Sequence, residues 1–291
     1  MDERDWLAER FEEHRAHLRA VAYRMLGSLT EADDAVQESW IRLSRSGGSG
    51  VENLGGWLTT AVARVCLDML RSRRSRREEP MGVDMPEPAG GGLDTAGPEQ
   101  EAVLADSIGM ALLVVLESLT PAERLSFVLH DVFAVPFDDV ARIMDRTPDS
   151  ARQLASRARR RVQAAPQPDR DVALQRRVVD AFLAAARGGD FEALLEVLDP
   201  DVVFRMDLGP VSRVTLRPLT GAGPVARQVL STAPRFVHLA QPVLVNGEAG
   251  VLFGTREEPV GVIGFTIVGG RIAALNLVAD QAKLRHLTIQ P

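Results

Sequence analysis

The sequence has very little cysteine, almost no lysine and no long apolar run, and these shortages exclude several classes of protein. Its 291 residues include one cysteine, Cys66, which rules out an internal disulfide and a CxxC metal site. The longest apolar run, residues 109–116, is far shorter than the ~20 residues that cross a bilayer. The charged start of the chain is followed by no apolar segment, so we expect no secretory signal. A cytoplasmic protein without a membrane partner is the expectation.

The charges are unevenly distributed along the chain. Of its 34 basic residues 33 are arginine and one is lysine, Lys283, a bias typical of a GC-rich bacterial genome. The net charge of −6 arises in residues 78–101, which hold seven acidic residues and no basic one. This stretch is rich in proline and glycine, which indicates a linker. At ~150 residues per domain, the chain has about two or three domains.

Apolar residues recur at helical spacing through the first 77 residues. The pattern predicts helices over residues 5–26, from about Thr30 onward and from about Leu54 onward, with Thr30 and Asp33 resembling a capping box. The third helix ends in a cluster of arginines, which also suits the helix dipole and does not by itself indicate DNA binding. No strand pattern occurs before residue 170.

Residues 120–162 have the pattern of a helix-turn-helix. Thr120, followed by proline and Glu123, predicts a capped helix start, and Thr147 followed by proline predicts another. A short helix over 137–143 and a tight turn over 144–146 lie between them. The last helix has small residues on one side and, on other faces, side chains suited to phosphates and base edges: Arg152, Gln153, Ser156, Arg157 and Arg160. The alternative is a solvated arginine-rich helix end.

From residue 172 onward the pattern changes to two helices followed by strands. Helices are expected up to Gly188 and over 191–198. Strands are expected over 202–206, 211–216, 242–245, 250–254, 260–268 and 271–278. The pairs Asn246-Gly247 and Gly269-Gly270 predict two-residue hairpin turns. Such a succession indicates a separate α+β domain.

Two stretches of the helical part resemble a known family. Tyr23–Leu26, Glu31–Trp40 and Trp57–Arg71 are similar to region 2 of extracytoplasmic-function (group IV, sigma-70-type) sigma factors, and Leu119–Arg160 is similar to their region 4. The resemblance implies that region 2 binds the clamp helices of core RNA polymerase and opens the −10 element of promoter DNA. It implies that region 4 reads the −35 element and holds the polymerase flap.

The resemblance also assigns roles to individual residues. Residues implied to bind polymerase are Asp33, Asp34, Gln37, Glu38 and Trp40. Residues implied to contact the −10 element are Trp57, Arg64, Arg71, Arg73 and Arg74, with Arg64 where the family often has asparagine. Residues implied to contact the −35 element are Arg152, Gln153, Ser156, Arg157 and Arg160. No catalytic residue, metal or cofactor is expected.

The C-terminal part resembles the SnoaL-like branch of the nuclear transport factor 2-like fold, a cone-shaped sheet that a subgroup of these sigma factors carries. The linker residues Asp84, Met85, Pro86, Glu87 and Pro88 resemble the subgroup's linker motif, and Asp280, Lys283 and Leu284 resemble its C-terminal signature. We therefore expect this domain to hold the linker in cis, so that no separate anti-sigma factor is required.

The expected architecture is multidomain: two all-α sigma domains, the second with a helix-turn-helix, followed by an α+β SnoaL-like cone domain. The expected boundaries are residues 1–77 for region 2, 78–101 for the linker, 102–165 for region 4 and 171–291 for the SnoaL-like regulatory domain. The alternative function is a SnoaL-like isomerase or hydrolase fused to a DNA-binding transcriptional regulator. Asp207 and His238 are then the nearest candidates for an acid–base pair, which requires both side chains in one apolar pocket.

Overall fold

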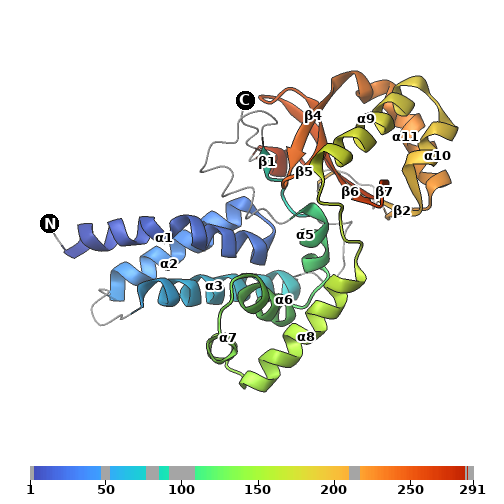
Figure 1. The fold of residues 1–291 in the computed structure, drawn as a ribbon. Coiled ribbons are helices and arrows are strands. Elements are labelled where there is room, and N and C mark those ends of the chain that lie inside the picture. Colours follow the sequence, from blue (N-terminus) through green and yellow to red (C-terminus); the bar gives the residue numbers. More distant parts are fainter. Residues whose placement is uncertain are drawn as a thin grey trace. The chain divides into compact units, whose positions relative to one another are not determined.

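The structure, a computed structural model, describes residues 3–46, 53–76, 85–91, 109–209, 217–285 and 287. The chain divides into two compact units, each built from two separate stretches of sequence (Figure 1). Residues 1–79 and 115–164 make the helical unit, and residues 80–114 and 165–291 make the sheet unit. The predicted order, two all-α domains followed by an α+β domain, is confirmed.

Three long helices begin the helical unit: α1 (Glu3–Leu26), α2 (Leu29–Ser46) and α3 (Leu54–Arg76). They pack around fully buried apolar side chains, among them Leu18 of α1, Leu43 of α2 and Leu58 of α3. Cys66 belongs to this core, as its place among apolar residues predicts, and burial raises the pKa of its thiol to about 12. This thiol therefore stays protonated at neutral pH.

The start of α2 differs from the prediction. Thr30 lies inside the helix, and the cap is Ser28, whose hydroxyl oxygen accepts a hydrogen bond from the Glu31 N–H at 3.1 Å. Gly27, with φ of 69°, makes the turn between α1 and α2. A hydroxyl just after a glycine turn was therefore the better start signal.

The helix-turn-helix forms at the predicted place. Helix α5 (Met110–Glu117) begins in residues assigned to the sheet unit and ends in the helical unit. The helical unit continues with α6 (Pro121–Phe127), a π-helical turn η1 (Val128–Val132), α7 (Phe137–Met144) and α8 (Pro148–Ala164). Thr120 and Glu123 make the predicted reciprocal capping box of α6. Asp145 ends α7 in the left-handed conformation, with φ of 54°. The small residues Ala151, Ala155 and Ala158 of α8 are fully buried, so α8 packs closely against α6.

The sheet unit is a mixed sheet with helices on one face. Its elements after α8 are α9 (Val172–Gly188), α10 (Phe191–Val197), β2 (Leu198–Asp207), β3 (Leu219–Thr220), α11 (Ala222–Phe236), η2 (Val237–Leu239), β4 (Ala240–Val245), β5 (Glu248–Gly254), β6 (Pro259–Val268), β7 (Arg271–Val278) and α12 (Gln281–Leu284). The strand order is β1-β4-β5-β6-β7-β2-β3, where β1 is Gly90–Gly91 and β2 pairs with β7 in parallel. The predicted hairpin turns join β4 to β5 and β6 to β7, with positive φ at all four turn residues.

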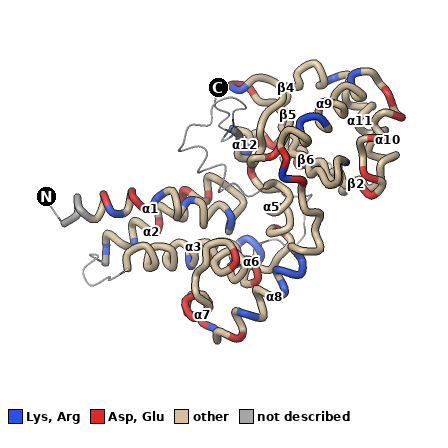
Figure 2. The backbone as a smooth tube through the Cα atoms, viewed as in Figure 1, with Lys and Arg blue, Asp and Glu red and all other residues tan. Residues whose placement is uncertain are grey.

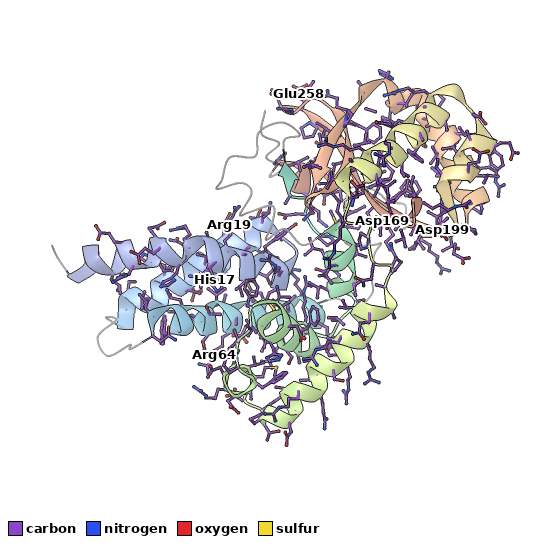
Figure 3. All side chains as sticks on the ribbon, viewed as in Figure 1. His17, Arg19, Arg64, Asp169, Asp199 and Glu258 are labelled. Atoms are coloured by element: carbon purple, nitrogen blue, oxygen red, sulfur yellow. The ribbon has the colours of Figure 1, made fainter. Side chains whose placement is uncertain are left out.

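The two faces of the sheet have different coverings. Helices α9, α10 and α11 pack on one face around a large core in which Phe182 meets Phe265 edge to face at 5.4 Å (Figure 1). The other face is covered by a smaller apolar cluster to which Met85, Met110 and Leu284 contribute. The segment that precedes α9 is fixed by Asp169 (Figure 3), whose carboxylate accepts hydrogen bonds from the Gly269 and Gly270 amides at 3.2 and 2.9 Å.

Two elements of the sheet unit are absent from the sequence prediction. The expectation of no strand before residue 170 is wrong, because Gly90 and Gly91 pair with Val245 and Leu244 of β4. Two glycines carry no side-chain pattern, so this pairing has no local signal. Helix α11 was missed although Val225, Val229 and Ala233 recur every fourth residue and are buried. The strand predicted over 211–216 lies outside the described residues.

No helix in the described ranges combines the length and the apolar character that a bilayer crossing needs.

Candidate functional site

The outer face of α8 brings together the five residues predicted for the −35 element. All five are exposed, while the opposite side of the helix is buried. Their spacing places them on adjoining turns, and Figure 2 shows basic residues along the length of this helix. They are Arg152, Gln153, Ser156, Arg157 and Arg160. The arrangement offers hydrogen-bond donors to an anionic surface on one side of one rigid helix.

Other arginines of α8 are engaged within the helical unit. Arg159 forms an ion pair with Asp131, and Arg161 reaches the Ser118 carbonyl at 3.2 Å and Glu123 at 3.4 Å. Arg152 contacts Asp149 at 2.6 Å, but both side chains are more than half exposed. Such surface pairs contribute little stability, so a phosphate can replace Asp149 as the partner of Arg152.

The five residues predicted for polymerase binding on α2 divide into two kinds. Asp33 pairs with Arg19 at 2.7 Å, Glu38 pairs with Arg42 at 3.0 Å, and Trp40 packs on the Phe11 ring with centroids 5.0 Å apart. Asp34 and Gln37 are exposed, and within the described part of the chain their side chains have no hydrogen-bond or ion-pair partner. These two are the members of the set that an incoming partner can reach without breaking an internal contact.

The residues predicted for the −10 element do not share one face of α3. Trp57, Arg64 and Arg71 are spaced seven residues apart, which is close to two helical turns, so they lie along one side. Arg64 (Figure 3) donates a hydrogen bond to the Arg142 carbonyl of α7 at 3.2 Å. Arg71 and Arg74 are exposed.

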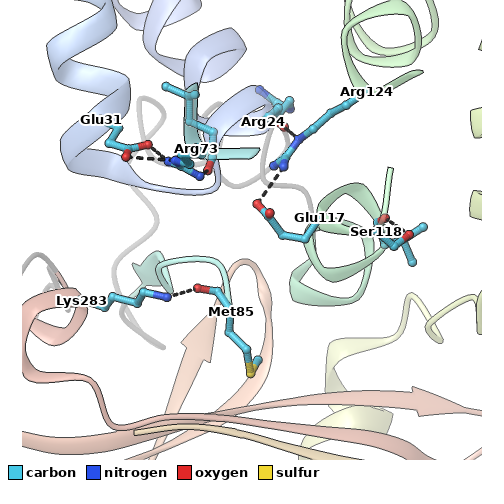
Figure 4. A network of polar contacts seen from close by, with 10 residues as sticks. Arg24, Glu31, Arg73, Met85, Glu117, Ser118, Arg124 and Lys283 are labelled. Atoms are coloured by element: carbon cyan, nitrogen blue, oxygen red, sulfur yellow. Dashed lines mark hydrogen bonds and ion pairs between the residues drawn. The ribbon is translucent and has the colours of Figure 1, made fainter. Parts of the chain in front are cut away.

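Arg73 lies on the opposite side of α3 and is partly buried. Its guanidinium donates to the Leu26 carbonyl at 3.0 Å and, through Nε, to the Glu31 carboxylate at 3.1 Å (Figure 4). It therefore ties the end of α3 to the junction of α1 and α2. The sequence already indicates that Arg73 faces away from the other predicted residues, because residue 73 is offset by about half a turn from the line through Trp57 and Arg64.

Arg124 is a buried basic residue that the sequence analysis did not single out. It is 2% exposed, and it pairs with Glu117 at 2.7 Å and donates to the Arg24 carbonyl of α1 at 3.1 Å (Figure 4). Because Arg24 belongs to the first three helices and Arg124 to the second group, this contact joins the two helical bundles. Its position one residue after the capping-box Glu123 carries no signal for that role.

The predicted linker motif lies against the second face of the sheet. Met85 is 2% exposed, and its N–H donates to Asp207 at 3.1 Å. The Lys283 ammonium donates to the Met85 carbonyl (Figure 4). It also donates to the Asp207 carboxylate at 2.7 Å. Farther along, Ala89 and Asn246 exchange two hydrogen bonds, of 3.0 and 2.6 Å. We call residues 85–91 together with Asp207, Asn246 and Lys283 the linker clamp.

The remaining residues of the two motifs have separate places. Pro86, Glu87 and Pro88 are buried, and Leu284 joins the apolar cluster around Met85. Asp280 caps α12 by accepting a hydrogen bond from the Ala282 N–H at 2.9 Å, so it stabilises the helix that carries Lys283. Asp84 lies outside the described residues. Asn246 and Asp207 were not predicted as partners of the linker.

Asp207 and His238 do not form an acid–base pair in a pocket. Asp207 is buried in the linker clamp, and His238 is exposed on η2. The cavity of the sheet unit, about 520 Å³, is lined by neither residue. The geometry that the enzymatic alternative requires is therefore absent from these two candidates.

Comparison with known proteins gives matches over both units. Residues 10–76 match the profile of sigma-70 region 2, and residues 109–162 match that of sigma-70 region 4. The ECF RNA polymerase sigma factor SigJ of Mycobacterium tuberculosis is 40% identical over 274 residues, 92% of this chain and 86% of that protein. The probable ECF RNA polymerase sigma factor SigI of the same organism is 34% identical over 296 residues, 99% of this chain and 98% of that protein.

A solved structure is similar over nearly the whole chain. The crystal structure of Mycobacterium tuberculosis extracytoplasmic function sigma factor SigJ has a TM-score of 0.79 and 34% sequence identity. It covers 97% of this chain and 100% of the crystallised chain.

Proposed function

Because the chain belongs to the ECF RNA polymerase sigma factors, we propose that its α2, α3 and α8 supply the contacts with polymerase and promoter. The protein is a promoter-specificity subunit that directs transcription initiation, with core RNA polymerase and promoter DNA as partners, and it is not an enzyme. Its place of action is the cytoplasm, where polymerase and DNA meet. The proposed division is residues 1–77 for region 2, 78–101 for the linker, 102–165 for region 4 and 171–291 for regulation.

Recognition of the −35 element is assigned to α8. The observation that supports this assignment is the exposed polar face of α8. The helix follows the tight turn at Asp145, and its opposite face consists of buried alanines. Side chains such as Arg157 and Gln153 reach phosphates and base edges when a helix of this kind enters the major groove. The −10 element is assigned to the side of α3 that carries Trp57, Arg64 and Arg71, together with the exposed Arg74.

Core polymerase is assigned to α2. Asp34 and Gln37 are exposed and have no internal partner in the described residues, so they suit a basic or polar partner surface. Asp33 and Glu38 each hold an exposed arginine, and these pairs are weak enough to be exchanged. Trp40 supports the helix by packing on Phe11. Region 4 is assigned the polymerase flap.

Regulation in cis is assigned to the linker clamp. With residues 85–91 held on the sheet, the eight residues between Arg76 and Met85 limit the distance from the end of α3 to Met85 to about 30 Å. The whole linker of 24 residues spans about 80 Å at full extension, and two helical turns of DNA cover roughly 70 Å. Release of the clamp frees region 2 from this short tether to the sheet, and the whole linker is long enough to connect two promoter elements. The fused domain then does the work of a separate anti-sigma factor, and none is required.

The proposal is tested by reconstitution with purified core RNA polymerase. The full chain is expected to co-elute with the core enzyme and to start transcripts at specific promoters. Reversal of charge at Asp34 and Glu38, to arginine, is expected to abolish co-elution while circular dichroism stays unchanged. A folded double variant that assembles like the wild type would refute the α2 assignment. Promoter binding without any association with polymerase would favour the DNA-binding regulator with a fused enzyme.

A further inference from the structure

The sheet unit contains a cavity that neither promoter recognition nor the linker clamp uses. Its volume is about 520 Å³, and its walls come mainly from α9, α11, β2, β6 and β7, with single residues from β3, β5 and η2. Buried apolar side chains form its interior, among them Phe182, Phe204, Ile263 and Leu275. Cavities of roughly 300–1,000 Å³ with apolar walls are typical of small-molecule sites.

Exposed large apolar side chains lie at the opening of this cavity. Among the described residues the exposed large hydrophobic side chains are Leu208, Phe236 and Val260, at 39%, 40% and 41% exposure. All three line the cavity, although they come from three different segments. Exposed apolar side chains that concentrate at one opening indicate an interaction site, because scattered ones would need no explanation.

Three polar side chains line the otherwise apolar cavity: Arg217, Gln228 and Thr232. The Thr232 hydroxyl donates to the Gln228 carbonyl at 3.0 Å. In the described part of the chain the Arg217 guanidinium and the Gln228 carboxamide have no hydrogen-bond or ion-pair partner. A cation and an amide donor that line one cavity favour a carboxylate over a neutral hydroxyl group.

Alternation along the strands connects the cavity with the linker clamp. Met206 and Leu208 line the cavity, while Asp207 between them accepts the Met85 N–H and the Lys283 ammonium on the other face. On β7 the same holds for Leu277, which lines the cavity, and Val278, which packs with Met85. A molecule packed against Leu208 therefore acts on the backbone that positions Asp207.

We propose that this cavity binds an apolar carboxylic acid, with its carboxylate at Arg217 and Gln228. Occupancy of the cavity weakens the contacts within the linker clamp that hold residues 85–91 on the sheet. Taking ~30 Å³ for each water-sized group, the cavity has room for about 15 to 20 non-hydrogen atoms. The coupling rests on the proposed regulation in cis, which it deepens by naming the class of signal. Close-packed interiors transmit such displacements, because neighbouring side chains have no free space to absorb them.

Binding is tested by titrating dodecanoic acid into the full chain in a calorimeter. Arg217→Gln is expected to bind about tenfold more weakly, since it removes a charge-assisted hydrogen bond. Ala233→Phe, which fills the cavity from α11, is expected to abolish binding, and Arg227→Gln, an exposed arginine of the same helix that does not line the cavity, serves as the matched control. Equal affinity for dodecanol, equal binding by wild type and Ala233→Phe, or no binding at all would overturn the proposed site. Arg217 is exposed, so its variant remains informative if Ala233→Phe fails to fold.

Coupling is tested by hydrogen exchange at the Met85 and Ala89 amides. Saturating dodecanoic acid is expected to raise both exchange rates about tenfold in the wild type, the effect of weakening the clamp by ~1.4 kcal/mol, and to leave them unchanged in Ala233→Phe. Binding with unaltered exchange would overturn the coupling. Both measurements use the free chain without polymerase, so a negative result leaves the transcription proposal to its own test.

Discussion

Helices α3 and α8 are both rich in arginine, yet they use it in different ways. On α8 the five predicted DNA-binding residues lie on exposed faces, opposite a stripe of buried alanines. On α3 the predicted set is divided, because Arg73 points away from Trp57 and Arg71 and is held by Glu31 and the Leu26 carbonyl. Arginine content is similar in both helices, but the surroundings separate the residues that face a partner from those that join helices.

Two further cations, one buried and one partly buried, join segments in the same way as Arg73. Arg124 joins two helical bundles, and Lys283 joins the linker to the sheet. Each of these side chains donates to a backbone carbonyl as well as to a carboxylate, a combination that fixes the position of a neighbouring segment. The exposed arginines of α8 that are assigned to DNA lack such carbonyl partners in the described residues, and they remain available to phosphates.

The largest effect is expected from changing the exposed residues of α8 that are predicted to contact the −35 element. Arg152→Ala combined with Arg157→Ala should remove two interactions with DNA, each worth about 1–3 kcal/mol, and lower the salt slope of promoter binding by about one for each phosphate that the helix no longer neutralises. Footprinting of the −35 region over a salt titration measures this, with Arg187→Ala, an exposed arginine of α9, as control. Protection of the −35 region that survives the double change at moderate salt would show that α8 is not the recognition helix.

Local patterns allowed most of the helical unit to be predicted. The capping box of Thr120 and the alanine stripe of α8 depend on residues a few positions apart, so the sequence displays them directly. The orientation of Arg73 follows from helical geometry as well, once Trp57 and Arg64 define the face. Family resemblance alone, which placed Arg73 with the DNA-contacting residues, does not contain that geometry.

Contacts between residues far apart in the chain were harder to predict from the sequence. The contact between the linker motif and Lys283 was predicted from two resembling motifs, but Asp207 and Asn246, which accept from Met85 and Ala89, carry no sequence signal for that role. Strand β1 consists of two glycines whose partner strand lies more than 150 residues away. The cavity depends on how eight helices and strands enclose a space, and the periodicity of a single element contains no information about that.

The second prediction concerns Glu248, a largely buried carboxyl group that, unlike the cations above, has no ion-pair partner in the described residues. Burial raises the pKa of Glu248 to about 7, and one of its oxygens has no hydrogen-bond partner in the described residues. Because its pKa in the folded state exceeds the ordinary value of 4.5, its contribution to stability is complete below pH 4.5 and is lost as pH rises through 7. Glu248→Gln should remove this loss, worth about 3 kcal/mol at pH 8.

Denaturant unfolding of the wild type and Glu248→Gln from pH 4 to 8 measures this difference. The two proteins should have similar free energies of unfolding at the acid end and should diverge as pH rises. Glu258→Gln, at an exposed glutamate of the same unit, is the control. Parallel pH profiles for wild type and Glu248→Gln would show that the buried carboxyl does not titrate in this range.

The third prediction concerns Lys283, the cation of the linker clamp. Lys283→Glu places a carboxylate beside Asp207 and the Met85 carbonyl, so it should release residues 85–91. Loss of charge-assisted hydrogen bonds worth about 1.5–3 kcal/mol should raise amide exchange at Met85 tenfold or more. Gln281→Glu adds a negative charge at an exposed position of α12 and should leave exchange unchanged. Purified transcription and spin-label distances between residues near 40 and 155 then report the consequence, and no change in either would refute regulation by the clamp.

The smallest effect is expected at two adjacent arginines of α3, and it tests the comparison most directly. Arg73→Ala removes a partly buried ion pair and a hydrogen bond to the Leu26 carbonyl, so the free energy of unfolding should fall by about 2 kcal/mol. Arg74→Ala changes an exposed side chain and should alter stability by less than about 0.5 kcal/mol, while it weakens opening of the −10 element. Denaturant unfolding and permanganate footprinting below the unfolding transition separate the two effects. If Arg73→Ala keeps full stability and loses promoter opening, then Arg73 contacts DNA and the division of the α3 arginines into inward and outward residues is wrong.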